Sequence, residues 1–286
     1  MWRCLFYRNG GASGAQGCRF GPRFECGLVR LHAVFGRIFY SPFGVAGSIG
    51  PGMSEQNDML YGAHPVEEAL KNPKRKFVKL MCTLNGAERL KEFTQPLGIT
   101  PEIVNPKVLD RLLEPDAVHQ GMILEAKPLR QPRLDQVEKS GVVVMLDQVT
   151  DPHNVGAILR TCAAFGVTAM VTTARHSPEA TGVLFKAASG AYEHVPFVKV
   201  TNLARAMEGL RLEGFRFVGL DSEADIGLAE IDKSLPLVLV LGAEGKGLRE
   251  LTRKNCDVVA KLDFSGAIRS LNVSNAAAVA LYALTH

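Results

Sequence analysis

Polar side chains and glycines gather in three short segments of the second half of the chain, each at the end of an apolar run or the start of a helical pattern. Amide, hydroxyl, carboxylate and guanidinium groups on neighbouring loops can bind a ligand and position it for reaction. The chain has no cysteine, histidine or aspartate cluster with zinc-ligand spacing, so we expect no metal. The segments are 147–160, 242–247 and 265–275, with candidate site residues Asn154, Arg160, Glu244, Ser270 and Asn272.

The first segment, 147–160, leaves the apolar run 142–146 and enters a helical pattern. Asn154 stands at the position of a helix N-cap, where its side-chain oxygen would accept a backbone N–H. The same residues are equally typical of a plain capped helix with Arg160 as a surface charge. This segment alone therefore does not define a site.

The second segment is a glycine-rich loop, Gly242-Ala243-Glu244-Gly245-Lys246-Gly247, directly after the apolar run 237–241. Its glycines permit positive φ and a close approach of the backbone to a ligand. It is not a phosphate-binding P-loop, because Lys246 is followed by Gly247 and not by Ser or Thr. It differs from the dinucleotide fingerprint, since its glycine order is reversed and Glu244 would repel a pyrophosphate. The loop favours a ligand that is not polyanionic, with an ordinary strand-to-helix turn as the alternative.

The third segment leads into the alanine-rich stretch 276–281, and Asn272 stands at a second N-cap position. The small residues of this stretch allow another helix to approach closely. A capped C-terminal core helix without a functional role explains the segment equally well when it is taken alone.

Short apolar runs alternate with helical patterns from Gly141 onward. Nearly continuous apolar strands separated by helices predict an α/β domain with a parallel sheet covered on both faces. Ligands of such sheets bind at the carboxyl ends of the strands. The predicted strands are 142–146, 169–171, 197–200, 215–220, 237–241 and 258–262.

The preceding part of the chain predicts a small α/β domain over 58–127, a proline-containing linker at 128–140 and a second domain at 141–286. In the small domain, helical patterns alternate with two strands. A basic run fits contacts with phosphates as well as it fits an ordinary solvated cluster. The helical patterns lie near 62–70, 87–94 and 106–113, the strands at 77–82 and 102–104, and the basic run is Lys71, Lys74, Arg75 and Lys76.

Residues 1–52 lack a helical or strand period and contain six arginines against one acid, Glu25. We interpret them as a disordered or spurious extension before a start at Met53, with an organellar transit peptide as the alternative. The whole chain, 286 residues with 47% hydrophobic residues, is typical of a protein that buries a sizeable core. Its six cysteines form no C-x-x-C pair, which indicates a reduced, cytoplasmic setting. The sequence contains no unbroken apolar run of roughly 20 residues, so we expect no membrane-spanning helix.

Taken together, the three polar segments resemble the signature motifs of the SpoU/TrmH family of RNA 2′-O-methyltransferases. The segments N-V-G-A-I-L-R at 154–160, L-G-A-E-G-K-G-L at 241–248 and S-L-N-V-S-N-A-A at 270–277 carry the resemblance. The earlier stretches 61–66 and 118–121 are similar to the family's RNA substrate-binding domain. The resemblance covers about residues 59–285.

This resemblance implies a trefoil-knotted methyltransferase domain, a homodimer with the site near the subunit interface, and S-adenosylmethionine as cofactor. Arg160 corresponds by motif position to the catalytic arginine, and the surrounding polar residues are Asn154, Glu244, Ser270 and Asn272. The backbone cradle of the cofactor corresponds to Gly242, Leu262 and Leu271. The sequence departs from the family's pattern at Asp263-Phe264, where Pro-Met is common.

The implied reaction is methyl transfer to a ribose 2′-hydroxyl of RNA, most closely a guanosine of 23S ribosomal RNA. A transfer RNA substrate and a non-catalytic, RNA-binding ribosome assembly factor are the alternatives. The substrate-binding domain favours ribosomal RNA, and the joint presence of the five polar residues favours an enzyme. The order of the glycines disfavours a nucleotide-dependent oxidoreductase.

Overall fold

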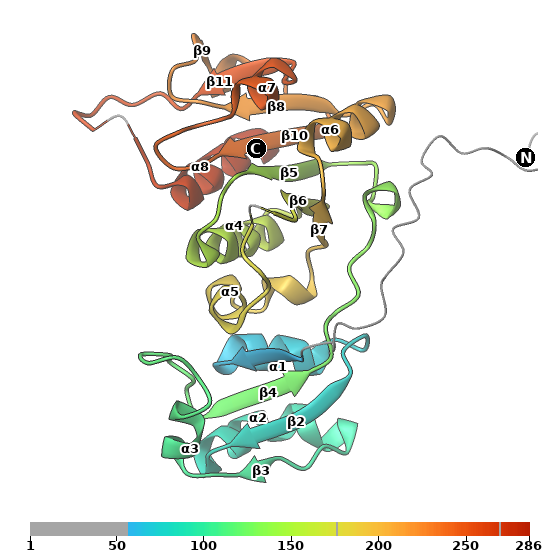
Figure 1. Cartoon of the computed structure of the whole chain (residues 1–286), viewed down its shortest axis with the longest axis vertical. Coiled ribbons are helices and arrows are strands. Elements are labelled where there is room, and N and C mark those ends of the chain that lie inside the picture. The colour runs from blue at the N-terminus through green and yellow to red at the C-terminus, as the bar shows by residue number, and fades with distance from the viewer. Residues whose placement is uncertain (1–56, 176, 269) are drawn as a thin grey trace, which may run out of the picture. The chain divides into compact units, whose positions relative to one another are not determined.

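The computed structural model describes residues 57–175, 177–268 and 270–286 (Figure 1). These residues form a four-stranded sheet in the order β1-β4-β2-β3 and a seven-stranded sheet in the order β7-β6-β5-β10-β8-β11-β9. The extension predicted at 1–52 and the start predicted at Met53 lie outside the described residues. Among the described helices, none has the length and apolar character needed to cross a membrane.

The four-stranded sheet and three helices form the small unit, in which the sequence predicts most elements correctly. Val66, Ala69 and Leu70 form the buried stripe of α1, as predicted. Sequence analysis missed β1 and β4, which pair with each other in antiparallel orientation. The elements are β1 (Asp58–Tyr61), α1 (Ala63–Lys71), β2 (Phe77–Cys82), α2 (Leu84–Leu97), β3 (Glu102–Ile103), α3 (Pro106–Asp110) and β4 (Met122–Ala126).

The seven-stranded sheet is parallel at every strand pair, which confirms the prediction for this domain. All six predicted strands are present, and the two-residue strand β9 is an addition at the sheet edge. The strands are β5 (Val142–Asp147), β6 (Ala169–Thr173), β7 (Phe197–Val200), β8 (Arg216–Leu220), β9 (Ile226–Gly227), β10 (Leu237–Gly242) and β11 (Val258–Lys261). The helices are α4 (Pro152–Ala164), α5 (Gly182–Ala188), α6 (Leu203–Leu212), α7 (Glu250–Lys254) and α8 (Val273–Thr285), with the 3-10 turns η1 (Leu134–Gln136), η2 (Ala191–Glu193) and η3 (Leu228–Glu230).

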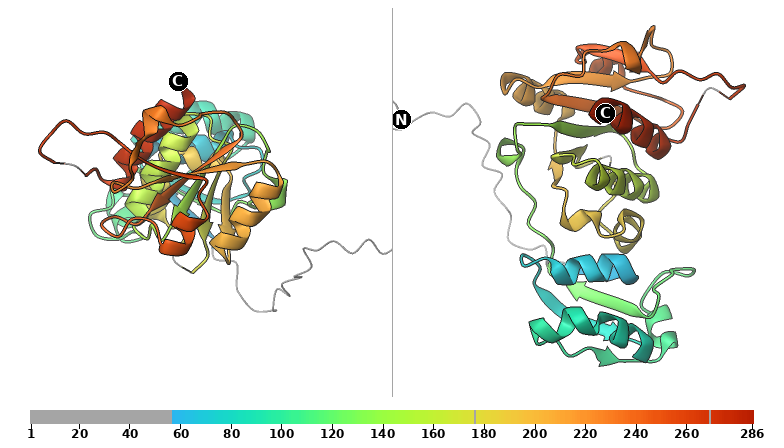
Figure 2. Two further views of the ribbon diagram at one scale, coloured as in Figure 1. Left: turned by 90° about the horizontal axis from the view of Figure 1, so that it is seen from above. Right: turned by 180° about the vertical axis from the view of Figure 1, so that it is seen from behind.

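Alternate residues of β5 enter two different hydrophobic cores. Val144 and Leu146 belong to the core that holds buried residues of α4, α5 and α8, whereas Val143 and Met145 belong to the core of α6. The views in Figure 2 show α4 and α8 on one side of the sheet and α6 on the other. The sheet is therefore covered on both faces, as the continuous apolar strands predict.

The strand order places the carboxyl ends of β5 and β10 side by side. The two strands pair in parallel, with Gly242 opposite Asp147. The loop that leads to α4 and the glycine-rich loop therefore start next to each other at one edge of the sheet.

Helix α4 begins earlier than the sequence predicts, and Asn154 is not its N-cap. Asp151 is the N-cap, because its carboxylate accepts the backbone N–H groups of His153 at 3.0 Å and Asn154 at 3.3 Å. Pro152 occupies the first helical turn, where its missing N–H costs nothing. The side chain of Asn154 is consequently free for contacts outside the helix.

Replacing Asp151 by Ala should lower the free energy of unfolding by about 1 kcal/mol, since two N–H groups of α4 lose their acceptor. Urea unfolding followed by circular dichroism measures the change. His153→Ala is the matched control, because His153 is exposed in the same turn and should change stability by less than about 0.5 kcal/mol. Equal stability of Asp151→Ala and the control would contradict this assignment of the cap.

Candidate active site

A hydrogen bond joins two of the predicted site residues from distant motifs. Asn272 Nδ2 donates to Asn154 Oδ1 at 2.9 Å, across 118 residues of sequence. Asn272 is also the N-cap of α8, as predicted, because its Oδ1 accepts the backbone N–H of Ser274 at 2.8 Å. The first and third motifs therefore meet at the starts of α4 and α8.

Next to this pair lies a cavity of about 380 Å³ at the carboxyl ends of β5 and β10. Its walls come from the loop before α4, the glycine-rich loop and the first residue of α8. A volume of this size is within the range of small-molecule and cofactor sites. The lining residues are Gln148, Val149, Thr150, Asp151, Asn154, Ala243, Glu244, Lys246 and Val273.

The glycine-rich loop folds back on itself. Ala243 and Gly247 exchange both backbone hydrogen bonds, at 3.1 and 2.9 Å, which leaves Glu244 exposed at the turn and beside the cavity. A Cβ on Gly242 would lie 2.2 Å from the carbonyl carbon of Gly247, so no side chain fits there without moving the loop. The absence of a side chain on Gly242 therefore allows a close approach of backbone within the loop itself, whereas the approach to a ligand stays a prediction.

A buried carboxylate ties the glycine-rich loop to β5. Asp147 Oδ1 accepts from Arg249 Nε at 2.6 Å, and Asp147 Oδ2 accepts from the Arg249 backbone N–H at 3.1 Å. The Asp147 side chain is 0% exposed, so its charge is compensated by this contact and not by water. Sequence analysis missed both residues; the only available signal was an acid directly after an apolar strand.

Gln148 is a second residue that sequence analysis missed. It follows Asp147, lines the cavity and has a φ of 61°, a left-handed conformation that is uncommon for residues other than Gly, Asn and Asp. Such backbone is retained where the surroundings determine it, often at functional sites. A Gln carries no sequence signal for this conformation.

The structure does not bring all the predicted residues to the cavity. Arg160 is exposed on α4, about 9 Å along the helix axis from Asn154, and it does not line the cavity. Ser270 and Leu271 are exposed in the segment between β11 and α8, and Leu262 is half-buried just after β11. The described part of the chain thus gathers Asn154, Asn272 and Glu244 at or beside the cavity. The other predicted site residues do not line it: Arg160, Ser270, Gly242, Leu262 and Leu271.

Thiol and metal chemistry find no support in the described residues. Burial raises the pKa of Cys82 to about 11 and that of Cys256 to about 12, so both thiols are protonated at neutral pH. Burial also raises the pKa of Cys162. Across residues 57–286, apart from 176 and 269, no group of three His, Cys, Asp or Glu side chains could hold a metal ion.

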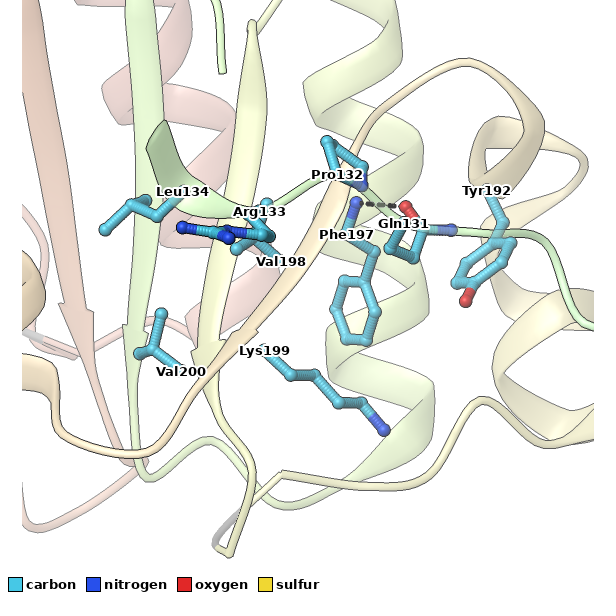
Figure 3. Close-up of a pocket in the computed structure, with 9 residues that line it drawn as sticks. All are labelled: Gln131, Pro132, Arg133, Leu134, Tyr192, Phe197, Val198, Lys199 and Val200. Carbon is cyan, nitrogen blue, oxygen red and sulfur yellow. Dashed lines mark hydrogen bonds between the residues drawn. The ribbon is translucent and has the colours of Figure 1, made fainter. Parts of the chain in front are cut away.

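A second cavity, of about 460 Å³, lies where residues 131–134 cross the edge strand β7 (Figure 3). Gln131 Oε1 accepts the backbone N–H of Phe197 at 2.9 Å, which pairs one outward-facing group of the edge strand. Phe197 and Tyr192 border this cavity but are buried in the core, so they present little aromatic surface to a ligand. We interpret this cavity as the seam between the linker and the sheet.

Comparisons with known proteins agree with the motifs. The SpoU rRNA methylase family model matches residues 141–282, and the RNA 2′-O ribose methyltransferase substrate-binding model matches residues 59–132. The 23S rRNA (guanosine-2′-O-)-methyltransferase RlmB of Pseudomonas aeruginosa is 40% identical over 240 residues, which cover 79% of this chain and 95% of that protein. RlmB of Vibrio cholerae is 39% identical over 243 residues, with 79% and 95% covered.

A solved structure shares the fold at low sequence identity. The SpoU methyltransferase AviRb from Streptomyces viridochromogenes, in complex with AdoMet, superposes with a TM-score of 0.68 at 22% identity, covering 80% of this chain and 89% of that one. The chain belongs to the SpoU rRNA methylase family, so the predicted family is confirmed.

Two substitutions of Asn272 should separate its two contacts. Asn272→Ser keeps an N-cap for α8 but is too short to reach Asn154, so stability should stay near that of the wild type. Asn272→Ala loses the cap as well and should be less stable than Asn272→Ser by about 1 kcal/mol. Thermal and urea unfolding of the pair measure this difference. If Ser and Ala were equally destabilising, the capping role of Asn272 would be wrong.

Proposed function

We propose that the chain transfers a methyl group from S-adenosylmethionine to the 2′-hydroxyl of a ribose in RNA, at a guanosine of 23S ribosomal RNA. The observation that carries the proposal is the Asn154–Asn272 hydrogen bond beside a cavity that Glu244 also lines. The bond joins residues of the first and third motif segments, and Glu244 of the second segment lines the cavity beside it, in a member of the SpoU rRNA methylase family. The names of the RlmB relatives support the RNA and the nucleotide.

The residues at this edge fit the proposed cofactor. When bound, S-adenosylmethionine supplies an electrophilic methyl group on a positively charged sulfur. The cavity is bordered by the carboxylates Asp151 and Glu244 and by the ammonium group of Lys246, a mixed set that suits a ligand with charges of both signs better than a polyphosphate. Gly242, Leu262 and Leu271 would contribute backbone groups to its cradle, and the half-buried Leu262 offers apolar surface for an adenosyl group.

Arg160 acts in this proposal on the ribose side of the reaction. A guanidinium stays protonated at neutral pH, which makes it a poor general base. We assign it the role of holding the nucleotide phosphate and stabilising the developing alkoxide as the 2′-hydroxyl loses its proton. Asn154, Glu244, Ser270 and Asn272 would orient the reacting groups around it.

A homodimer accounts for the distance between Arg160 and the cavity. Arg160 does not line the cavity of its own chain, while Val279 and Tyr282 leave apolar surface exposed on α8, which packs against α4. We propose that a second copy covers α8 and that Arg160 of one subunit completes the site of the other. The family's trefoil knot and a cytoplasmic location belong to the same proposal.

The small unit favours ribosomal RNA over transfer RNA as the substrate. It corresponds to the match with the substrate-binding model over residues 59–132. We retain the division into a substrate-binding domain at 58–127, a linker at 128–140 and a methyltransferase domain at 141–286. Transfer RNA methylation and a non-catalytic role in ribosome assembly are the alternatives.

Methyl transfer from labelled S-adenosylmethionine to separate pools of ribosomal and transfer RNA tests the proposal. Label should appear in 23S ribosomal RNA as a 2′-O-methylguanosine, located by nuclease digestion. Arg160→Ala should lose at least about a hundredfold in rate, and Arg160→Lys should recover only part of it, since an ammonium cannot replace the guanidinium fork. Wild-type rates in Arg160→Lys would refute the guanidinium role, and label in transfer RNA alone would favour the alternative substrate.

Mixing two inactive variants tests the shared site. If Arg160 and Glu244 serve the same site from different subunits, Arg160→Ala and Glu244→Ala should complement each other after subunit exchange. Half of the dimers are then mixed and hold one intact site each, so about a quarter of the wild-type rate should return. Absence of complementation between variants shown to form mixed dimers would place both residues in one chain's site.

A further inference from the structure

Arg75, one member of the basic run predicted from the sequence, is buried and turned into the fold. Its side chain is 0% exposed, and Nη1 donates to Asp58 at 2.6 Å and to the Lys127 carbonyl at 2.9 Å. Nε donates to Glu193 Oε1 at 2.9 Å. Asp58 and Lys127 belong to the small unit, whereas Glu193 belongs to η2 beside the seven-stranded sheet. The phosphate contact considered for Arg75 is therefore wrong, because this guanidinium is already paired.

The Glu193 carboxylate accepts the hydrogen bond of Arg75 on the side of the seven-stranded sheet. Its side chain is 1% exposed and accepts from both Arg75 and Asn72 Nδ2, the latter at 2.6 Å. Two outer contacts accompany it, from His194 to Glu68 at 2.7 Å and from Lys186 to Gln120 at 3.0 Å. We call these cross-unit contacts the joint.

Helix α5 connects the joint to the candidate active site through two close glycine contacts. A Cβ on Gly182 of α5 would lie 2.6 Å from Tyr61 Cε1 of β1. A Cβ on Gly156 of α4 would lie 2.6 Å from Ala187 Cβ and 2.7 Å from the Leu184 carbonyl of α5. Helix α5 lies between the small unit and α4 in Figure 1. Since α4 carries Asn154 and Arg160, α5 links the small unit to the helix that positions the site.

We propose that Glu193 and Arg75 form a positioning pair that fixes the substrate-binding unit to the methyltransferase domain, so that bound RNA meets the active site at a set distance. The inference rests on the proposed function for the identity of the RNA. Apolar contacts alone are not directional, whereas a buried guanidinium paired with two carboxylates accepts only one arrangement. Both residues act through other elements and are not catalytic.

Glu193→Gln is the sharpest test, because it removes one charge and keeps the shape and the Asn72 contact. Arg75 stays paired with Asp58, so no buried charge is left alone. Glu213→Gln is the matched control, since Glu213 pairs with Lys139 on the exposed surface. Steady-state methyl transfer to 23S ribosomal RNA, S-adenosylmethionine binding by calorimetry and hydrogen–deuterium exchange are measured on the full chain.

Glu193→Gln should raise KM for the RNA at least about tenfold, the equivalent of one charge-assisted hydrogen bond. Its kcat at saturating RNA and its cofactor affinity should remain within about twofold of the wild type. Amide exchange in β1 and η2 should accelerate in Glu193→Gln and not in the control. Unchanged KM and unchanged exchange would overturn the proposal, as would a loss confined to kcat.

The exchange measurement separates this inference from the proposed function. If the wild type methylates no ribosomal RNA, the proposed function fails, and faster exchange in Glu193→Gln still supports the joint. If Glu193→Gln does not fold, Lys186→Met combined with His194→Ala weakens only the outer contacts. That double variant should raise KM severalfold and accelerate exchange in β1, and wild-type values for both would overturn the proposal.

Discussion

The parallel pairing of β5 with β10 is the constraint on which the candidate site depends. The paired residues of these strands are 95 positions apart in sequence, yet Gly242 lies directly opposite Asp147. A parallel register brings two carboxyl ends to the same edge, so the loop before α4 and the glycine-rich loop begin side by side. A shift of the pairing register by one residue would move the side chains of the shifted strand from the core on one face of the sheet to the core on the other.

Polar contacts then fix the loops relative to that edge. Asp147 is buried at the end of β5, and it holds both the guanidinium and the backbone N–H of Arg249, just beyond the glycine-rich loop. Only the carboxylate of this pair is buried, so removing Arg249 would leave the Asp147 charge without a partner and without water. The Asn154–Asn272 bond adds the start of α8 to the same assembly. The cavity is thus bordered by segments that are each tied to another, which is the preorganisation that group transfer requires.

The sequence predicted the parts of the structure that depend on local pattern. The six longer strands of the parallel sheet are continuous apolar runs, and Asn272 carries the local signature of an N-cap. Asn154 has the same signature, but Asp151-Pro152 upstream is the stronger helix start, so the cap prediction failed there. The Asp147–Arg249 pair and the burial of Arg75 arise from contacts across 102 and 118 residues, which no local pattern encodes. The gathering of motif residues at one edge followed from the family resemblance together with the rule for parallel sheets.

Calorimetric titration of S-adenosylmethionine into the wild type and Gly242→Ala tests whether the loops after β5 and β10 form the methyl-donor site. A Cβ at Gly242 would meet the backbone of Gly247 at 2.2 Å, whereas one at Gly209 of α6 would meet nothing within 4 Å, which makes Gly209→Ala the control. We expect saturable binding to the wild type and to Gly209→Ala, and loss of binding in a folded Gly242→Ala. Absence of binding to the wild type, or equal binding to Gly242→Ala, would contradict it.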